Sequence, residues 1–184
     1  LLKARFLNHL SKTEQYDPEA VLSALDKGME GNEDDAQVVY FEQRFNPWAE
    51  VAIDNEELLL GGWISEQFIQ AMDGTSFGIF DPRLPLMVGT TDAGVFLGTA
   101  NGAGRGSAPE AGARSTLIPD QFYTSEMSPL LIATYAEQKF IEAEAAYDLN
   151  KTRSYQAYTE GISAHMEMLG VQNADIEAYL ADPA

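Results

Sequence analysis

Two tryptophans and one tyrosine are the residues of this chain best suited to bind a ligand. Trp48 and Trp63 are the only tryptophans in the sequence. A flat indole can stack on the apolar C–H face of a sugar ring, so an exposed tryptophan favours a neutral sugar as ligand. Tyr123 is a third candidate because it follows a glycine-rich segment. The alternative for each tryptophan is packing in a core, and Trp63 suits that role because it precedes a helix cap at Ser65.

Catalytic and metal-binding residues have no comparable pattern. His9 and His165 stand alone on helical patterns, and Asp34-Asp35 lacks the alternating oxygen ligands of a calcium loop. Gly102–Gly106 suggests phosphate binding, but it neither follows a clear strand nor opens a helix. The chain has 29 acidic residues, so pairs of carboxylates arise by chance and are no evidence for hydrolysis. We therefore expect no catalytic residue, no metal site and no cofactor.

Composition limits the partners of the chain. Its 184 residues carry a formal net charge of −18, from 11 Lys and Arg against 29 Asp and Glu. Nucleic acid and anionic membrane surfaces are thereby disfavoured, because both require clustered cations. A hydrophobic content of 45% is typical of a globular domain, and the absence of cysteine excludes disulfides and thiolate metal sites. Neutral ligands such as sugars remain open, and so do cations.

Two helical hairpins are predicted, one near each end of the chain. Ser128 can cap a helix that starts at Pro129 and runs to Tyr147. A second helix over about 152–169 ends at Gly170 and carries the apolar stripe Tyr155, Tyr158, Ile162, Met166 and Leu169. This hairpin, 128–170, has the alanine-rich and tyrosine-rich character of tetratricopeptide-like repeats.

The first hairpin occupies residues 1–30. Its first helix is predicted to bury Leu2, Phe6, Leu7 and Leu10. Its second helix starts at Asp17-Pro18 and is predicted to bury Val21, Leu22, Leu25 and Met29. The first helix lacks a cap and a last helix, 173–184, looks truncated, so we expect an interior fragment of a longer protein.

The middle of the chain, 31–127, is predicted to be irregular and rich in loops. We expect a short strand at Gln37–Phe41, a rigid turn at Asn46-Pro47-Trp48, and a long loop from Gly89 to Gly112. Ser65 is predicted to cap a helix that buries Phe68, Ile69 and Met72. In Asp81-Pro82-Arg83-Leu84-Pro85 the prolines exclude a regular helix, and Arg83 is expected to form a salt bridge with a nearby acid.

Five sequence motifs together resemble the SusD/RagB family of nutrient-binding lipoproteins. They are Leu2–Phe6, Asn46-Pro47-Trp48, Gly61–Ser65, Asp81–Pro85 and Tyr135–Ala145, and they lie in the order found in that family. The resemblance implies a mainly α fold in which tetratricopeptide-like hairpins form a scaffold and long loops build the ligand face. It covers an interior part of a family member, so the lipid-bearing N-terminal cysteine and the C-terminal part would lie outside this chain.

The resemblance also implies a function. Members are non-enzymatic proteins of the bacterial cell surface in Bacteroidetes, anchored to the outer membrane by a lipid. They bind glycans or oligosaccharides and deliver them to a SusC-like TonB-dependent transporter. The alternative is a tetratricopeptide-like scaffold that binds a protein or peptide. Exposed aromatic residues on the loops would favour the sugar, and exposed aromatic residues in a helical groove would favour the peptide.

Overall fold

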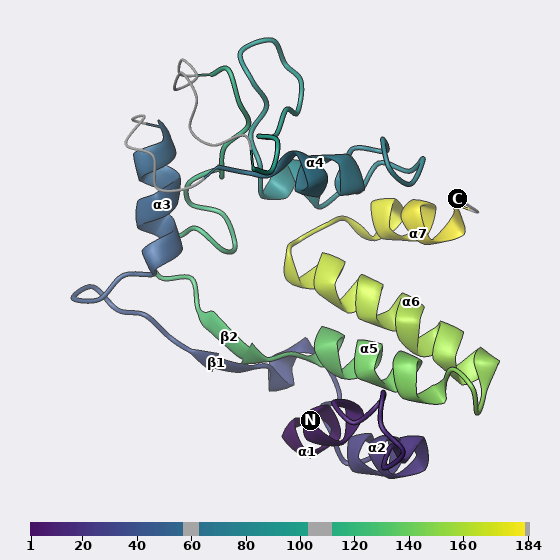
Figure 1. The fold of residues 1–184 in the computed structure, drawn as a ribbon. Helices are drawn as coiled ribbons and strands as arrows, with labels where there is room; N and C mark the ends of the chain where they lie inside the picture. The colour runs from purple at the N-terminus through teal and green to yellow at the C-terminus, as the bar shows by residue number, and fades with distance from the viewer. Residues whose placement is uncertain (57–62, 103–111, 183–184) are drawn as a thin grey trace. The chain divides into compact units, whose positions relative to one another are not determined.

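The computed structural model describes residues 1–56, 63–102 and 112–182, and most of its regular structure is helical (Figure 1). The helices are α1 (Leu2–Asn8), α2 (Pro18–Leu25), α3 (Pro47–Glu56), α4 (Glu66–Met72), α5 (Tyr135–Ala146), α6 (Lys151–Met168) and α7 (Asn173–Ala181). Strands β1 (Ala36–Val38) and β2 (Leu130–Ala133) pair in a two-stranded sheet. The predicted mainly α class is confirmed. None of these helices is both long enough and apolar enough to span a bilayer.

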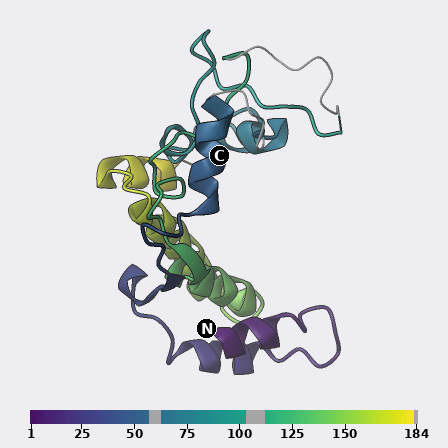
Figure 2. The ribbon, with the colours of Figure 1, turned by 90° about the vertical axis from the view of Figure 1, so that its left-hand side faces the viewer.

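The chain divides into two compact units. Unit 1 comprises residues 1–38 and 131–170, and unit 2 comprises residues 39–130 and 171–184. In unit 1, α5 and α6 form an antiparallel hairpin and lie side by side in both views (Figures 1 and 2). A side chain at Gly161 would meet the Phe140 ring at 3.1 Å and the Ala136 carbonyl oxygen at 3.2 Å, so glycine lets the two helices approach closely.

The predicted start of the long helix at Ser128 is wrong. Helix α5 begins at Tyr135, and Thr134 caps it by accepting a hydrogen bond from the Glu137 N–H at 3.1 Å. Residues 130–133 instead form β2, which pairs with β1. Ser128 is buried and donates its hydroxyl proton to the Gln121 carbonyl oxygen. The stretch thus holds two possible caps, and pairing with a distant strand selects the second.

The apolar stripe predicted on α6 is confirmed at one end only. Ile162 and Met166 are buried, as is Leu169 just after the helix, and Gly170 has the left-handed φ of +82° expected after a helix end. Tyr155 and Tyr158 are exposed instead.

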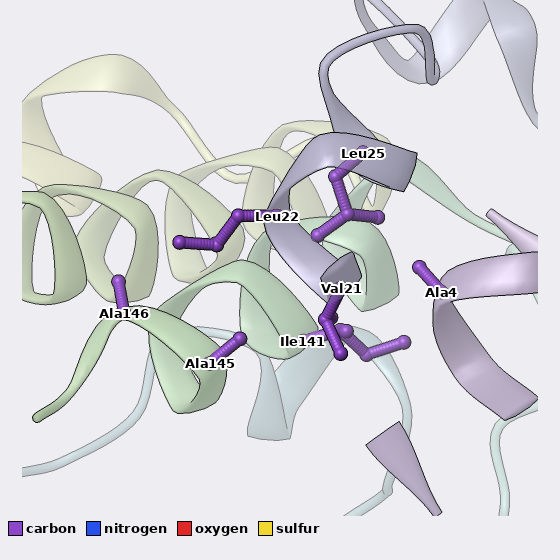
Figure 3. Packing of buried hydrophobic residues seen from close by; sticks show 7 residues of the cluster. All are labelled: Ala4, Val21, Leu22, Leu25, Ile141, Ala145 and Ala146. Atoms are coloured by element: carbon purple, nitrogen blue, oxygen red, sulfur yellow. The ribbon is translucent and has the colours of Figure 1, made fainter. Parts of the chain in front are cut away.

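Helices α1 and α2 pack against α5 through a small apolar core (Figure 3). Asp17 accepts a hydrogen bond from the Ala20 N–H, and Pro18 starts α2 as predicted. The core residues are Ala4, Val21, Leu22, Leu25, Ile141, Ala145 and Ala146.

The buried face of α1 differs from the prediction. Leu2 and Phe6 are exposed, while Ala4 and Asn8 are buried. Ala4 allows close packing, and Asn8 donates to the Glu144 carboxylate at 2.8 Å and accepts from the Tyr16 hydroxyl. Polar pairing therefore sets the orientation of α1, which apolar periodicity alone cannot reveal.

Unit 2 holds the second core, formed by Ile69, Met72, Leu84 and Val88. The ion pair predicted for Arg83 is confirmed, since its guanidinium contacts the buried Asp81 carboxylate. Residues Leu84–Leu86 form a short 3-10 turn. The strand predicted at Gln37–Phe41 is confirmed only in part, because β1 covers 36–38 and ends before Phe41. Residues 103–111 of the predicted long loop lie outside the described part of the chain.

Candidate functional site

Unit 2 contains a pocket of about 580 Å³ that the three candidate aromatic residues line together. Trp48 comes from the first turn of α3, Trp63 from the segment before α4, and Tyr123 from the loop before β2. The described residues that line it are Trp48, Val51, Trp63, Ile64, Ser65, Phe68, Leu86, Met87, Val88, Leu117, Gln121, Tyr123 and Thr124.

Asn46 holds Trp48 in place. The predicted rigid turn at Asn46-Pro47-Trp48 is instead the start of helix α3. Pro47 is the first residue of α3, and the Asn46 side chain accepts the Trp48 N–H at 2.9 Å as a helix cap. Its amide nitrogen donates to the main-chain carbonyl oxygens of Tyr123 and Ser128, both at 3.1 Å. One buried side chain therefore connects the helix that carries Trp48 to the loop that carries Tyr123. The Trp48 side chain remains 56% exposed, so a ligand can reach its ring.

Trp63 is positioned by a short stretch of main-chain pairing. The Thr99 N–H donates to the Ile64 carbonyl oxygen, and the Glu66 N–H donates to the Thr99 carbonyl oxygen, each at 2.8 Å. Gly98 makes this approach possible, because a β-carbon there would lie 2.5 Å from the Glu66 main chain. Ser65 caps α4 as predicted, and its hydroxyl accepts the Phe68 N–H at 3.1 Å.

The aliphatic part of the pocket belongs to the core of unit 2. Val88 is 1% exposed and lies in the core, while Ile64 and Met87 pack against that core and also line the pocket. The Ile118 N–H donates to the Met87 carbonyl oxygen at 3.0 Å, so the Leu117 segment is paired to this wall. The wall is therefore fixed before any ligand binds.

The loop that carries Tyr123 is closed by its own hydrogen bonds. The Thr124 hydroxyl donates to the Ile118 carbonyl oxygen and accepts the Gln121 N–H. Asp120 adopts a left-handed φ of 55°, which a short acidic side chain tolerates at a turn. The Phe122 and Tyr123 rings contact each other edge to face with centroids 5.0 Å apart. These contacts fix the position of the Tyr123 main chain.

The chemistry of this pocket is that of stacking and apolar contact. Its described lining has aromatic and aliphatic side chains, three polar residues and no charged one. Among the described residues, no cluster of three or more His, Asp or Glu is arranged to hold a metal ion. Sequence reasoning singled out the aromatic residues but missed Gln121 and the aliphatic wall, which have no local signal of their own. It placed Phe68 in the core, whereas Phe68 is 40% exposed at the pocket.

The acidic residues of α5 have structural roles. Glu137 forms an ion pair with Arg5, and Glu142 contacts both Lys139 and Arg153. Neither Glu137 nor Glu142 is among the described residues that line the unit 2 pocket.

Unit 1 has a separate groove of about 620 Å³ along the α5–α6 hairpin. Five aromatic residues line it, namely Tyr16, Phe140, Tyr147, Tyr155 and Tyr158. The Lys151 ammonium lies 3.0 Å from the centroid of the Tyr147 ring, a cation–π contact. Burial and the nearby carboxylates of Glu144 and Asp148 raise the pKa of Tyr16, so its hydroxyl stays protonated at neutral pH.

Comparison with known proteins identifies the family. A family model described as "Starch-binding associating with outer membrane", named SusD-like, matches residues 2–184. No curated protein gave a significant match to the sequence.

Three solved structures show how closely the fold is shared. A SusD homologue from Bacteroides fragilis superposes with a TM-score of 0.74 and 23% identity over 99% of this chain and 45% of its own. A SusD homologue from Bacteroides vulgatus superposes with a TM-score of 0.70 and 18% identity, over 97% of this chain and 36% of its own. A chitin-binding protein superposes with a TM-score of 0.72 and 20% identity, over 96% of this chain and 41% of its own.

At these identities the structural likeness establishes the fold, and the chain spans less than half the length of those proteins. The family model, by contrast, covers nearly every residue. The predicted resemblance is therefore confirmed: the chain belongs to the SusD/RagB family and has its tetratricopeptide-like helical fold.

Proposed function

We propose that this chain binds a glycan or oligosaccharide in the unit 2 pocket without cleaving it. The observation that carries the proposal is the convergence of Trp48, Trp63 and Tyr123 on one pocket whose walls are already fixed. Flat aromatic rings bind the apolar faces of sugars, and hydroxyl groups at the edges of the sugar reach polar groups and water. The family description as starch-binding supports the same ligand class, as does a structural neighbour named as chitin-binding.

Binding without hydrolysis agrees with the lining of the pocket. Glycoside hydrolysis normally requires two carboxyl groups on either side of the scissile bond. Neither Asp nor Glu is among the described residues that line this pocket. The aromatic residues can hold a sugar, but none of the described lining residues supplies the acid and the nucleophile or base.

The proposed place of action is the bacterial outer membrane at the cell surface, with a lipid anchor holding the protein there. There the protein would deliver its sugar to a SusC-like TonB-dependent transporter. Association of the family with the outer membrane supports this placement. The aromatic groove of unit 1 supports contact with a protein partner, because exposed tyrosines are frequent at protein interfaces.

A titration of the purified protein with neutral oligosaccharides, followed by tryptophan fluorescence and calorimetry, tests the proposal. We expect saturable binding and an affinity about 5- to 150-fold weaker in Trp48→Ala, because aromatic stacking contacts contribute about 1–3 kcal/mol. Helix content should not change, since the ring is more than half exposed. Phe77→Ala is the matched control, because Phe77 is 66% exposed and absent from the pocket lining.

Two outcomes would contradict parts of the proposal. Unchanged affinity in Trp48→Ala would remove Trp48 from the site. Absence of binding to every neutral oligosaccharide would favour the alternative, a scaffold for a protein or peptide. Where sugar binding is found, Tyr155→Ala in the unit 1 groove separates the two surfaces: it should weaken association with the transporter and leave sugar affinity unchanged.

A further inference from the structure

The lining of the unit 2 pocket contrasts with the composition of the whole chain. The chain has a net charge of −18, yet no described residue lining the pocket is charged. An anionic sugar would be repelled by the field of the protein and would find no cation among the described lining residues. A cationic amino sugar would find no carboxylate among those residues, and burying an unpaired ammonium group is costly. The pocket therefore selects for uncharged sugars.

Polar groups in the pocket are few, and two of the three polar side chains are already engaged. The Ser65 hydroxyl accepts the Phe68 N–H, and the Thr124 hydroxyl bonds to both Ile118 and Gln121. Gln121 differs, because the hydrogen bonds that close the loop use its main-chain N–H and carbonyl groups. Its side-chain carboxamide is thus the best placed of the three to bond a ligand.

An aliphatic wall occupies much of the remaining surface. Val51, Ile64, Leu86, Met87, Val88 and Leu117 line the pocket and cannot bond to hydroxyl groups. A sugar hydroxyl pressed against this wall would lose its water without gaining a partner. A methyl group in the same place would gain from leaving water.

We infer that the pocket prefers uncharged sugar units that carry an N-acetyl group. The acetamido methyl would contact the aliphatic wall, and the acetamido N–H and C=O would pair with the Gln121 carboxamide. The sugar ring itself would stack on Trp48 or Trp63. This inference rests on the proposed glycan-binding function and adds the chemical class of the sugar.

Three sets of β-1,4-linked oligosaccharides of equal length test the inference, because they differ only at C2 of each ring. N-acetylglucosamine oligomers carry an acetamido group, cello-oligosaccharides a hydroxyl and glucosamine oligomers an ammonium. Calorimetry at pH 6, where the amine is protonated, should give an affinity for the acetylated oligomer at least about fivefold above each of the others.

The outcomes separate this inference from the proposed function. Equal or stronger binding of the cello-oligosaccharide would overturn the N-acetyl preference and leave glycan binding standing. No binding of any of the three oligomers would overturn the inference alone, because the proposed function is overturned only if the wider panel of neutral oligosaccharides also fails to bind. Gln121→Leu should reduce the preference for the acetylated oligomer while keeping the fold, since the loop bonds use the Gln121 main chain. An unchanged ratio in that variant would refute the role of Gln121, and Phe77→Ala should change neither affinity nor ratio.

Discussion

Replacement of Asn46 by alanine should loosen the pocket and destabilise unit 2. The side chain is 4% exposed and makes three hydrogen bonds: one caps α3 at the Trp48 N–H, and two reach the carbonyl oxygens of Tyr123 and Ser128. Loss of a helix cap costs about 1 kcal/mol, and each of the other two bonds about 1 kcal/mol. The variant should therefore lose about 3 kcal/mol of unfolding free energy.

Asn46→Ser is the matched variant. Serine also caps helices well, but its shorter side chain cannot reach both carbonyl oxygens. We expect it to recover the cap and to lose about 2 kcal/mol. Sugar affinity should fall in both variants, because Trp48 and Tyr123 are no longer held by a shared side chain.

Urea unfolding followed by tryptophan fluorescence is the appropriate assay. Both tryptophans lie in unit 2, so the signal reports on the part of the chain that Asn46 stabilises. Far-UV circular dichroism, recorded in parallel, reports mainly on the longer helices of unit 1. A loss of less than about 0.5 kcal/mol in Asn46→Ala would refute the reasoning, because substitutions of that size are typical of surface positions.

Three further changes test other parts of the structure. Gly98→Ala should cost about 1–3 kcal/mol in urea unfolding and weaken sugar binding, because its β-carbon would lie 2.5 Å from the Glu66 main chain; wild-type stability would disprove the close approach. Thr134→Ala should lower stability by about 1 kcal/mol through loss of the α5 cap, while Thr134→Ser should stay near wild type; equal losses in both would point away from capping. Burial alone would raise the pKa of Glu160, but hydrogen bonds from Tyr135 and Lys139 outweigh it and lower that pKa. Glu160→Gln should therefore lower the melting temperature slightly at pH 7, and the difference should vanish as the pH falls through the lowered pKa of the Glu160 carboxylate. A difference independent of pH would exclude the charge as its cause.

Capping residues in the sequence predicted a helix end correctly wherever the segment offered a single candidate cap. Asp17-Pro18, Ser65 and Gly170 each mark a terminus, because capping depends only on neighbouring residues. Ser128-Pro129 failed because Thr134 offers a second cap, and the choice depends on pairing between β1 and β2. Strand pairing over such a distance has no local signature.

The same limit applies to the site. Aromatic type and nearby turns were enough to single out Trp48, Trp63 and Tyr123, but not to show that they share one pocket. Asn46-Pro47 carries the cap-and-proline signal of a helix start, as Asp17-Pro18 does, and recognising it would have placed Trp48 on a helix. The role proposed for Gln121 depends on a fold that brings it into the same pocket as Phe68 of α4, which the sequence does not reveal.

The walls of the pocket come from four separate stretches of chain, and two of the anchors join one stretch to another. Asn46 ties the start of α3 to the loop that carries Tyr123, and the Met87 carbonyl oxygen pairs that same loop region, at Ile118, with the aliphatic wall. The Thr99 pairing, by contrast, holds residues 63–65. A substitution at Asn46 therefore shifts two walls together, whereas one at Gly98 or Thr99 shifts the wall that carries Trp63. Ligand preference can thus diverge between relatives either one wall at a time or in coupled pairs.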